Sequence, residues 1–288
     1  MAYDIDEPQR GSIPTNFSQL DEVHITTPSH SILNHCLKNV RYPSCRSLKM
    51  TVDPDDFDAD PEVSLFPYGL LEIADVISLS ECFSPVLKEL VFELEFALGF
   101  DVVVPLLSFS RLTNLRLDWI CTSAIDDASL KTIAQSWPQL ETFWFGGAVL
   151  WVVPPSLTFI GFAHLIYHCR RLCNIQMSFR ACPVDINSEP FSKTIPNENI
   201  TSFSVAVSPI VDPISVACQL RRLLPKLTEV YFLDWLAYKL HVPPSFEHYE
   251  DGWSTVNEFL GVRHYYKWRR NRLKIAAHAL GLTGRIAQ

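Results

Sequence analysis

The chain has 288 residues, of which 48% are hydrophobic and 19% are charged, and its formal net charge at pH 7 is −8. This composition excludes a disordered or collagen-like chain, and the negative charge argues against a surface that binds nucleic acid broadly. The acidic start of the sequence carries no secretory signal. The eight cysteines are therefore expected to be reduced thiols, most of them buried.

A pattern of three apolar residues spaced L-x-x-L-x-L, as in Leu112, Leu115 and Leu117, recurs along the chain. Eight copies begin at intervals of 25, 42, 25, 28, 32, 28 and 27 residues. Leucine-rich repeats have this pattern and a period of about 20–29 residues, and each repeat forms a short strand and a helix. The copies are Leu20, Val23, Ile25; Cys45, Leu48, Met50; Leu87, Leu90, Phe92; Leu112, Leu115, Leu117; Leu140, Phe143, Phe145; Leu172, Ile175, Met177; Ile200, Phe203, Val205; and Leu227, Val230, Phe232.

The segments between the copies have apolar residues at helical spacing. Asp126 and Asp127 are suited to the N-terminus of one such helix. "FSQL", "FSRL", "WPQL" and "LPKL" precede or enter the strands and predict a turn there. Alternating strands and helices with right-handed crossovers predict a parallel sheet that curves into an α/β solenoid. Helices are expected within residues 28–40, 70–82, 126–137, 155–169 and 212–224.

The repeats define the expected domain organisation. Residues 1–16 form an N-terminal extension, and residues 17–248 form the leucine-rich-repeat solenoid. The long interval is explained by an acidic insertion at residues 53–62, "DPDDFDADPE". Residues 249–288 are expected to form a C-terminal cap helix and a basic tail.

The run "LLSFSRLTNLRLDW…IDDASLKTIAQSWPQLETFWF" resembles the leucine-rich-repeat region of F-box-type proteins of mushroom-forming (basidiomycete) fungi. "PSLTFIGFAHLIYHCRRLCNIQM", "NENITSFSVAVSPIVDPISVACQLRRLLPKLTEVYF" and "WSTVNEFL" extend the resemblance over roughly residues 17 to 262. It implies the substrate receptor of a cullin-type ubiquitin ligase, in which the repeats hold the target and an F-box holds the adaptor. Only 19 residues precede Leu20, so the F-box is expected to be lost or to lie outside this chain.

The ninth position of each copy departs from the family, because it lacks the usual Asn. Without an asparagine ladder, the solenoid is expected to be irregular. The residues at this position are Pro28, Asp53, Glu95, Ile120, Ala148, Arg180, Ser208 and Trp235.

Side chains on a strand alternate in direction, so the residues between the apolar positions are expected to point onto the concave face. Trp144 and Tyr231 are candidate anchors for a protein partner, because large aromatic side chains are common at interfaces; alternatively, loops or the terminal helix cover them. The mixed charges argue against a phosphate-binding stripe. The expected concave-face residues are Glu22, His24, Lys49, Glu89, Val91, Arg116, Asp118, Thr142, Trp144, Asn174, Gln176, Ser202, Ser204, Glu229 and Tyr231. The predicted partner-binding residues among them are Trp144, Tyr231, Arg116, Asp118, Gln176, Glu229, Lys49 and His24.

Motifs of known catalytic sites are absent from the sequence, which contains no P-loop, G-x-S-x-G, G-x-G-x-x-G or H-E-x-x-H. His164 and His168 with Cys169, Cys173 and Cys182 have spacings that zinc could use. Cys173 falls on a repeat strand and no C-x-x-C pair exists, so we expect these residues to pack without metal. We expect no catalytic residue, cofactor or metal.

The acidic insertion imitates the start of a calcium loop with Asp56, Asp58 and Asp60. Pro61 stands where such a loop needs Gly, and Pro67 stands where it needs Glu. We therefore expect a solvated acidic loop rather than a calcium site.

Residues 142–169 contain no Asp, Glu, Lys or Arg and are long enough to span a bilayer. Pro154 and Pro155 interrupt this stretch. We therefore expect a buried strand and helix joined by a turn, and no membrane span.

The C-terminal segment has no acidic residue from position 259 onward. Its basic cluster consists of Lys267, Arg269, Arg270, Arg272 and Lys274. Three interpretations stay open: a cap helix on the last repeat, a nuclear-import or partner-binding signal, and nucleic-acid binding. The apolar stripe expected for a cap helix is Phe259, Val262, Tyr266, Leu273, Ala276 and Leu280.

Three classes of function follow. The first, which we favour, is a non-enzymatic interaction protein of the F-box/leucine-rich-repeat type. The second is an adaptor that acts through its basic tail without a ligase role, and the third is an enzyme with a scattered site. We expect a cytoplasmic or nuclear monomer with a protein partner on the concave face. Cullin-ligase components join it if an F-box lies upstream, and neither a membrane nor nucleic acid is an expected partner.

Overall fold

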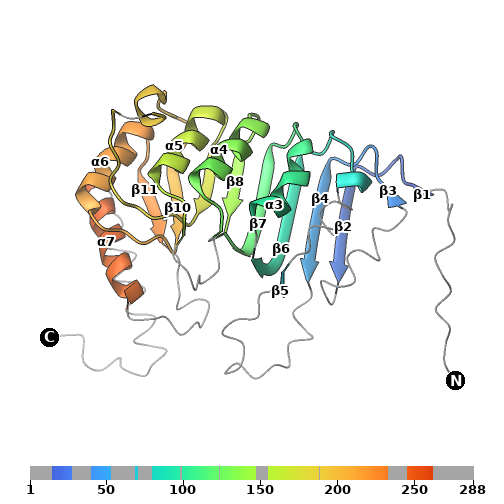
Figure 1. The fold of residues 1–288 in the computed structure, drawn as a ribbon, viewed down its shortest axis with the longest axis horizontal. Helices are drawn as coiled ribbons and strands as arrows, with labels where there is room; N and C mark the ends of the chain where they lie inside the picture. Colours follow the sequence, from blue (N-terminus) through green and yellow to red (C-terminus); the bar gives the residue numbers. More distant parts are fainter. Residues whose placement is uncertain are drawn as a thin grey trace, which may run out of the picture.

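The computed structural model describes residues 15–27, 40–52, 69–70, 80–97, 99–122, 124–146, 155–187, 189–232 and 245–261. Its main feature is a parallel β-sheet whose strands follow one another in sequence order along the long axis of the molecule (Figure 1). The eight strands of this row are β2 (Glu22–Thr27), β4 (Ser47–Val52), β6 (Glu89–Ala97), β7 (Asn114–Cys121), β8 (Thr142–Phe145), β9 (Asn174–Met177), β10 (Ser202–Ala206) and β11 (Glu229–Phe232). The short β5 (Gly69–Leu70) pairs with β6, while β1 (Thr15–Asn16) and β3 (Val40–Arg41) form a separate pair.

The apolar pattern is in register from strand to strand. The middle apolar residues of the eight copies pair in one continuous line: Val23, Leu48, Leu90, Leu115, Phe143, Ile175, Phe203 and Val230. From Cys45 to Val230, every repeat-pattern residue is at most 3% exposed. This confirms an α/β fold in which the spaced apolar residues build one core.

The two ends of the row depart from the expected burial. Leu20 is 42% exposed, while Val23 and Ile25 are half-buried and pack against the core, so the first copy joins the core only in part. The reason is topological, because β2 is the terminal strand and pairs on one side only, with β4. At the other end Phe232 is half-buried and pairs with Ala206 after a register shift.

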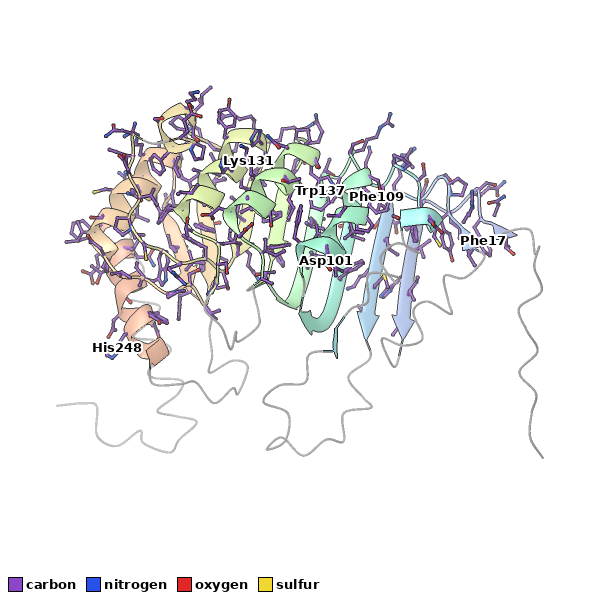
Figure 2. All side chains as sticks on the ribbon, viewed as in Figure 1. Phe17, Asp101, Phe109, Lys131, Trp137 and His248 are labelled. Carbon is purple, nitrogen blue, oxygen red and sulfur yellow. The ribbon has the colours of Figure 1, made fainter. Side chains whose placement is uncertain are left out.

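The same turn precedes most strands. In six copies, the backbone N–H of the first apolar residue donates to the carbonyl three residues earlier, at 3.0–3.3 Å, as Leu112 does to Phe109 and Leu140 to Trp137. Phe109 and Trp137 are themselves at most 1% exposed and end helical segments (Figure 2). The turn predicted at "FSRL", "WPQL" and "LPKL" is therefore confirmed.

Helices line one face of the sheet (Figure 1). The described helices are α3 (Phe100–Val103), α4 (Asp127–Ser136), α5 (Phe159–His168), α6 (Pro213–Leu223) and α7 (Ser245–Leu260), with 3₁₀ turns η3 (Val104–Ser108) and η4 (Phe191–Lys193). The helices expected within 126–137, 155–169 and 212–224 are confirmed. Those expected within 28–40 and 70–82 lie largely outside the described residues, as do the acidic insertion with Asp56, Asp58 and Asp60 and most of the basic tail.

Two adjacent aspartates at the start of α4 have different partners. Asp126 caps α4 as predicted, because its Oδ1 accepts from the N–H of Ser129 at 2.8 Å. Asp127 was expected to serve the same helix. Its carboxylate instead accepts from the N–H of Thr158 at 2.8 Å and of Gly161 at 2.9 Å, and from Thr158 Oγ1 at 2.6 Å. The carboxylate of Asp127, in the first turn of α4, thus accepts hydrogen bonds from the N-terminus of α5.

The helix α7 closes the C-terminal edge of the sheet. The amide of Asn257 accepts from Val230 N–H at 2.9 Å and donates to Val230 C=O at 2.8 Å, as a neighbouring strand would. Trp253 is buried, and its indole N–H donates to Ser208 C=O at 2.8 Å. A helix at "WSTVNEFL" is confirmed, but Phe259 is 56% exposed and does not belong to a docked apolar stripe.

The pairing of the strands is irregular at two places in the sheet. Register shifts occur between Glu93 and Phe96 and between Ser204 and Ala206. Ser208, which stands at the ninth position of its copy, donates to Val205 C=O at 2.5 Å and accepts from Phe179 N–H at 2.9 Å.

The stretch 142–169 contains β8 and α5, which confirms a strand followed by a buried helix. Within the part of the chain that is described, no helix is long and apolar enough to cross a membrane.

Candidate functional site

The face of the sheet opposite the helices, here called the open face, presents two rows of side chains that are register partners. The first row holds Glu22, Ser47, Glu89, Asn114, Thr142 and Asn174. The second row holds His24, Lys49, Val91, Arg116, Trp144, Gln176, Ser204 and Tyr231. Val91 was expected on the accessible surface but is only 6% exposed.

Arg116 and Trp144 form a pair within the second row. They are register partners on β7 and β8, and the guanidinium carbon of Arg116 lies 3.8 Å from the centre of the Trp144 ring. A cation over an indole face is attracted by the ring quadrupole. Trp144 is half-buried. Arg116 thus contacts one ring face, a role not foreseen for it.

Tyr231 occupies the far end of the second row on β11 and is 47% exposed. Its hydroxyl donates to Glu229 Oε2 at 2.5 Å. This hydrogen bond, together with burial and the negative charge of Glu229, raises the pKa of Tyr231 to about 12. The hydrogen bond directs the phenol hydroxyl toward Glu229.

A hollow of about 310 Å³ lies between Trp144 and Tyr231. We call it the aromatic hollow. Four strands, β8 to β11, contribute to it, and the lining between the two rings is mostly uncharged and polar. Its other lining residues are Asn174, Ile175, Gln176, Ser202 and Ser204.

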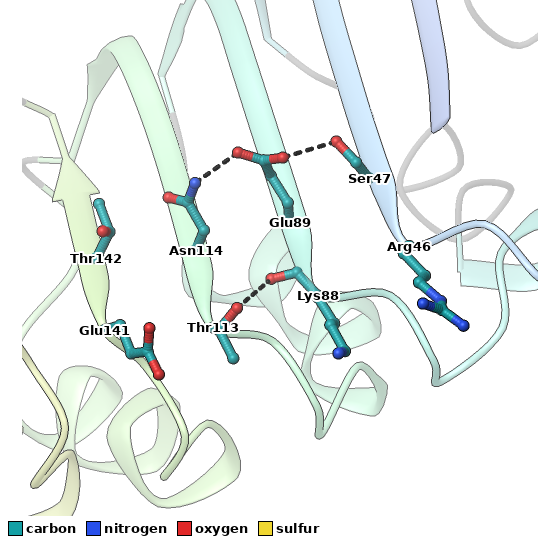
Figure 3. Close-up of a pocket in the computed structure, with 8 residues that line it drawn as sticks. All are labelled: Arg46, Ser47, Lys88, Glu89, Thr113, Asn114, Glu141 and Thr142. Atoms are coloured by element: carbon teal, nitrogen blue, oxygen red, sulfur yellow. Dashed lines mark hydrogen bonds between the residues drawn. The ribbon is translucent and has the colours of Figure 1, made fainter. Parts of the chain in front are cut away.

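A second hollow, of about 380 Å³, lies over β4 to β8 at the start of these strands (Figure 3). At its centre, Glu89 accepts from Ser47 Oγ at 2.8 Å and from Asn114 Nδ2 at 2.5 Å. We call it the acceptor hollow. It is lined by Arg46, Ser47, Lys88, Glu89, Thr113, Asn114, Glu141 and Thr142.

The predicted partner-binding residues fall into three groups. Trp144, Gln176 and Tyr231 line the aromatic hollow, and Arg116 and Glu229 hold its two rings. His24, whose ring lies 3.3 Å from Thr51 Oγ1, and Lys49 belong to the second row but line neither hollow. The side chain of Asp118 lies outside the described residues, and so do Lys267, Arg269, Arg270, Arg272 and Lys274.

Sequence reasoning missed Ser47 and Asn114. Each lies directly before the middle apolar residue of its copy, which is the position that Glu89 and Thr142 occupy in their own copies. The same alternation that selected Glu89 would have found them.

The His164 and His168 rings lie 6.2 Å apart on α5, and burial with the positive charge of Lys131 lowers the pKa of both. The Cys169 thiol donates to the carbonyls of Ala134 and Trp137 at 3.5 and 3.4 Å, and burial raises its pKa to about 12. The Cys169 thiol is therefore hydrogen-bonded to the C-terminal end of α4. Among the described residues, no three His, Cys, Asp or Glu side chains are grouped as a metal site would need.

No family model matches the chain, and no curated protein matches it in sequence.

Proposed function

We propose that the chain is a leucine-rich-repeat solenoid without catalytic activity that binds a protein partner on its open face. The observation that carries this proposal is the aromatic hollow, in which Trp144 on β8 and Tyr231 on β11 lie on either side of an uncharged, mostly polar lining.

The repeat assignment is supported by the in-register apolar copies and by the turn that recurs before the strands. A stack of similar strand–helix units buries a continuous core and leaves one broad sheet face for binding. Such a face suits a protein ligand better than the deep, dry pocket that small molecules need.

The recognition role is supported by the state of the two rings. Trp and Tyr are the residue types most often found to dominate interface energetics. Here both are held in place before a partner arrives, Trp144 by Arg116 and Tyr231 by Glu229. Holding an anchor in one orientation lowers the entropy that binding must overcome.

The ligase role rests on the family resemblance alone and predicts cullin-ligase subunits among the partners. The basic cluster at 267–274 lies outside the described residues, so the adaptor alternative gains no support from the structure.

The test is affinity purification of the full chain from its own cells, with mass spectrometry of what is recovered. The double variant Trp144→Ala/Tyr231→Ala is compared with Tyr167→Ala, a control on α5 whose side chain is 41% exposed on the helical side. We expect a partner that is recovered with the wild type and the control and lost with the double variant. Identical partners for all three chains would contradict the proposal.

A further inference from the structure

We propose that the acceptor hollow binds a basic side chain, Arg or Lys, of the same protein partner. This inference rests on the proposed function and deepens it, because it names the chemistry that the partner must carry. It follows from a surplus of hydrogen-bond acceptors around the carboxylate of Glu89.

The Glu89 carboxylate is oriented but not neutralised. Ser47 Oγ and Asn114 Nδ2 hold its two oxygens at 2.8 and 2.5 Å, and among the described residues the structure gives Glu89 no cationic partner. An ionised carboxylate can accept about four hydrogen bonds. Both oxygens therefore keep capacity for an incoming donor.

Asn114 supplies a second acceptor that lacks a donor. Its Nδ2 must face Glu89, because a carboxylate only accepts, and this fixes the orientation of the amide. The opposite atom, Oδ1, is buried and no hydrogen bond to it is formed within the described residues. A buried acceptor without a donor costs about 1–3 kcal/mol. In Figure 3 this oxygen is turned toward Thr142, away from Glu89.

The charged groups on the rim are engaged elsewhere or directed away. Arg46 lies 3.8 Å from Asp21, and Glu141 is ion-paired with Arg171. The side chain of Lys88 extends away from the Glu89 carboxylate (Figure 3). The centre of the hollow is thus rich in acceptors, and a guanidinium or ammonium group, which only donates, complements it.

The two hollows meet on β8, where Thr142 borders the acceptor hollow and Trp144 borders the aromatic one. Glu89 on β6 is two strands away from β8, which is about 10 Å at the usual strand spacing. An extended partner segment that crosses the strands covers this distance with about three residues. We therefore expect the basic residue to lie about three to five residues from an apolar or aromatic residue that contacts Trp144.

The test uses random short peptides displayed on phage and selected on the full chain. We expect wild-type selection to enrich peptides with Arg or Lys at this distance from an aromatic or aliphatic residue. Replacing that Arg by citrulline, which removes the charge, should weaken binding of the synthetic peptide to the wild type by about tenfold or more. The same replacement should have less than about a twofold effect on Glu89→Gln, while the control Glu141→Gln behaves as the wild type.

The outcomes separate this inference from the proposed function. Peptides that need Trp144 and Tyr231 but show no basic residue, or acidic peptides attracted to Arg46 and Lys88, would overturn the acceptor hollow and leave the binding face standing. An equal effect of citrulline on Glu89→Gln and on the wild type would overturn it as well. Peptides that bind Trp144→Ala/Tyr231→Ala as well as the wild type would contradict the aromatic hollow, and a selection that enriches no sequence would contradict both.

Discussion

The carboxylate of Asp127, at the start of α4, accepts the backbone N–H of Gly161 in the first turn of α5 at 2.9 Å. A Cβ added to Gly161 would lie 2.5 Å from the same carboxylate oxygen. A glycine is thus required at this position, because the Asp127 carboxylate lies too close to leave room for a side chain. This contact bridges two successive strand–helix units through polar atoms, beside the apolar packing of the two helices.

Asp127→Ala is expected to destabilise the protein by about 1–3 kcal/mol, because it leaves donors at the start of α5 without their acceptor. Asp126→Ala, which removes an ordinary cap, should cost about 1 kcal/mol. Urea denaturation of the two variants measures the difference. If Asp127→Ala proved no more harmful than Asp126→Ala, the bridge between α4 and α5 would contribute nothing.

Gly161→Ala is expected to destabilise by about 1–3 kcal/mol, since the new methyl group displaces the Asp127 carboxylate. The same substitution should cost less in the Asp127→Ala background, because part of the clash is gone. The comparison is a double-mutant cycle of unfolding free energies. Strict additivity would show that the clash lies elsewhere, with Leu130 or Leu157 at 3.3 Å.

Two N-cap aspartates make the stability of the folded protein depend on pH in the acid range. Hydrogen bonds from Ser129 lower the pKa of Asp126, and those from Ser215 lower the pKa of Asp212, below the ordinary 3.8. A lowered folded-state pKa gives stability that is present above the unfolded pKa and lost as pH falls through the folded one. The double variant Asp126→Asn/Asp212→Asn should therefore lose less stability than the wild type below about pH 4. If thermal melts from pH 6 to acid pH showed the same loss of stability for the wild type and the double variant, this prediction would be wrong.

Asn257→Ala is expected to cost about 1–3 kcal/mol, because it leaves the backbone N–H and C=O of Val230 unpaired at the edge of the sheet. Phe259→Ala on the same helix is the control and should change stability by less than about 0.5 kcal/mol, since its ring is 56% exposed. Thermal melting of both variants tests whether the hydrogen bonds between Asn257 and Val230 stabilise the protein. A negligible loss of stability for Asn257→Ala would mean that water satisfies the backbone N–H and C=O of Val230 equally well.

The strands could be predicted from the sequence because three apolar residues at fixed spacing must all reach one core. The helices at 126–137, 155–169 and 212–224 followed from their apolar faces and caps. The role of Asp127 could not be predicted, because its partners are 31 and 34 residues away and no local pattern marks such a contact. The exposure of Leu20 follows from its place beside the terminal strand, which spacing alone does not reveal.

The open face was predicted in outline and missed in detail. Alternation along a strand placed Trp144 and Tyr231 correctly on one face. The contact of Arg116 with Trp144 depends on the register of β7 against β8, and the burial of Val91 depends on its neighbours. Neither can be read from one strand.

Trp144→Ala separates binding from folding. Removing this half-buried ring should cost about 0.5–1 kcal/mol of stability through the lost contact with Arg116, whereas Phe143→Ala next to it, with a fully buried ring, should cost about 3–5 kcal/mol. Thermal unfolding checks both. A loss for Trp144→Ala as large as that for Phe143→Ala would place Trp144 in the core.

The most direct test of the binding face is the affinity of the recovered partner for the purified chain, measured by calorimetry with wild type, Trp144→Ala and Tyr167→Ala. We expect Trp144→Ala to raise Kd by about thirtyfold or more, as loss of an interface anchor does, and Tyr167→Ala to leave Kd unchanged. Equal Kd values for all three chains would contradict the account, because the partner would then bind elsewhere on the molecule.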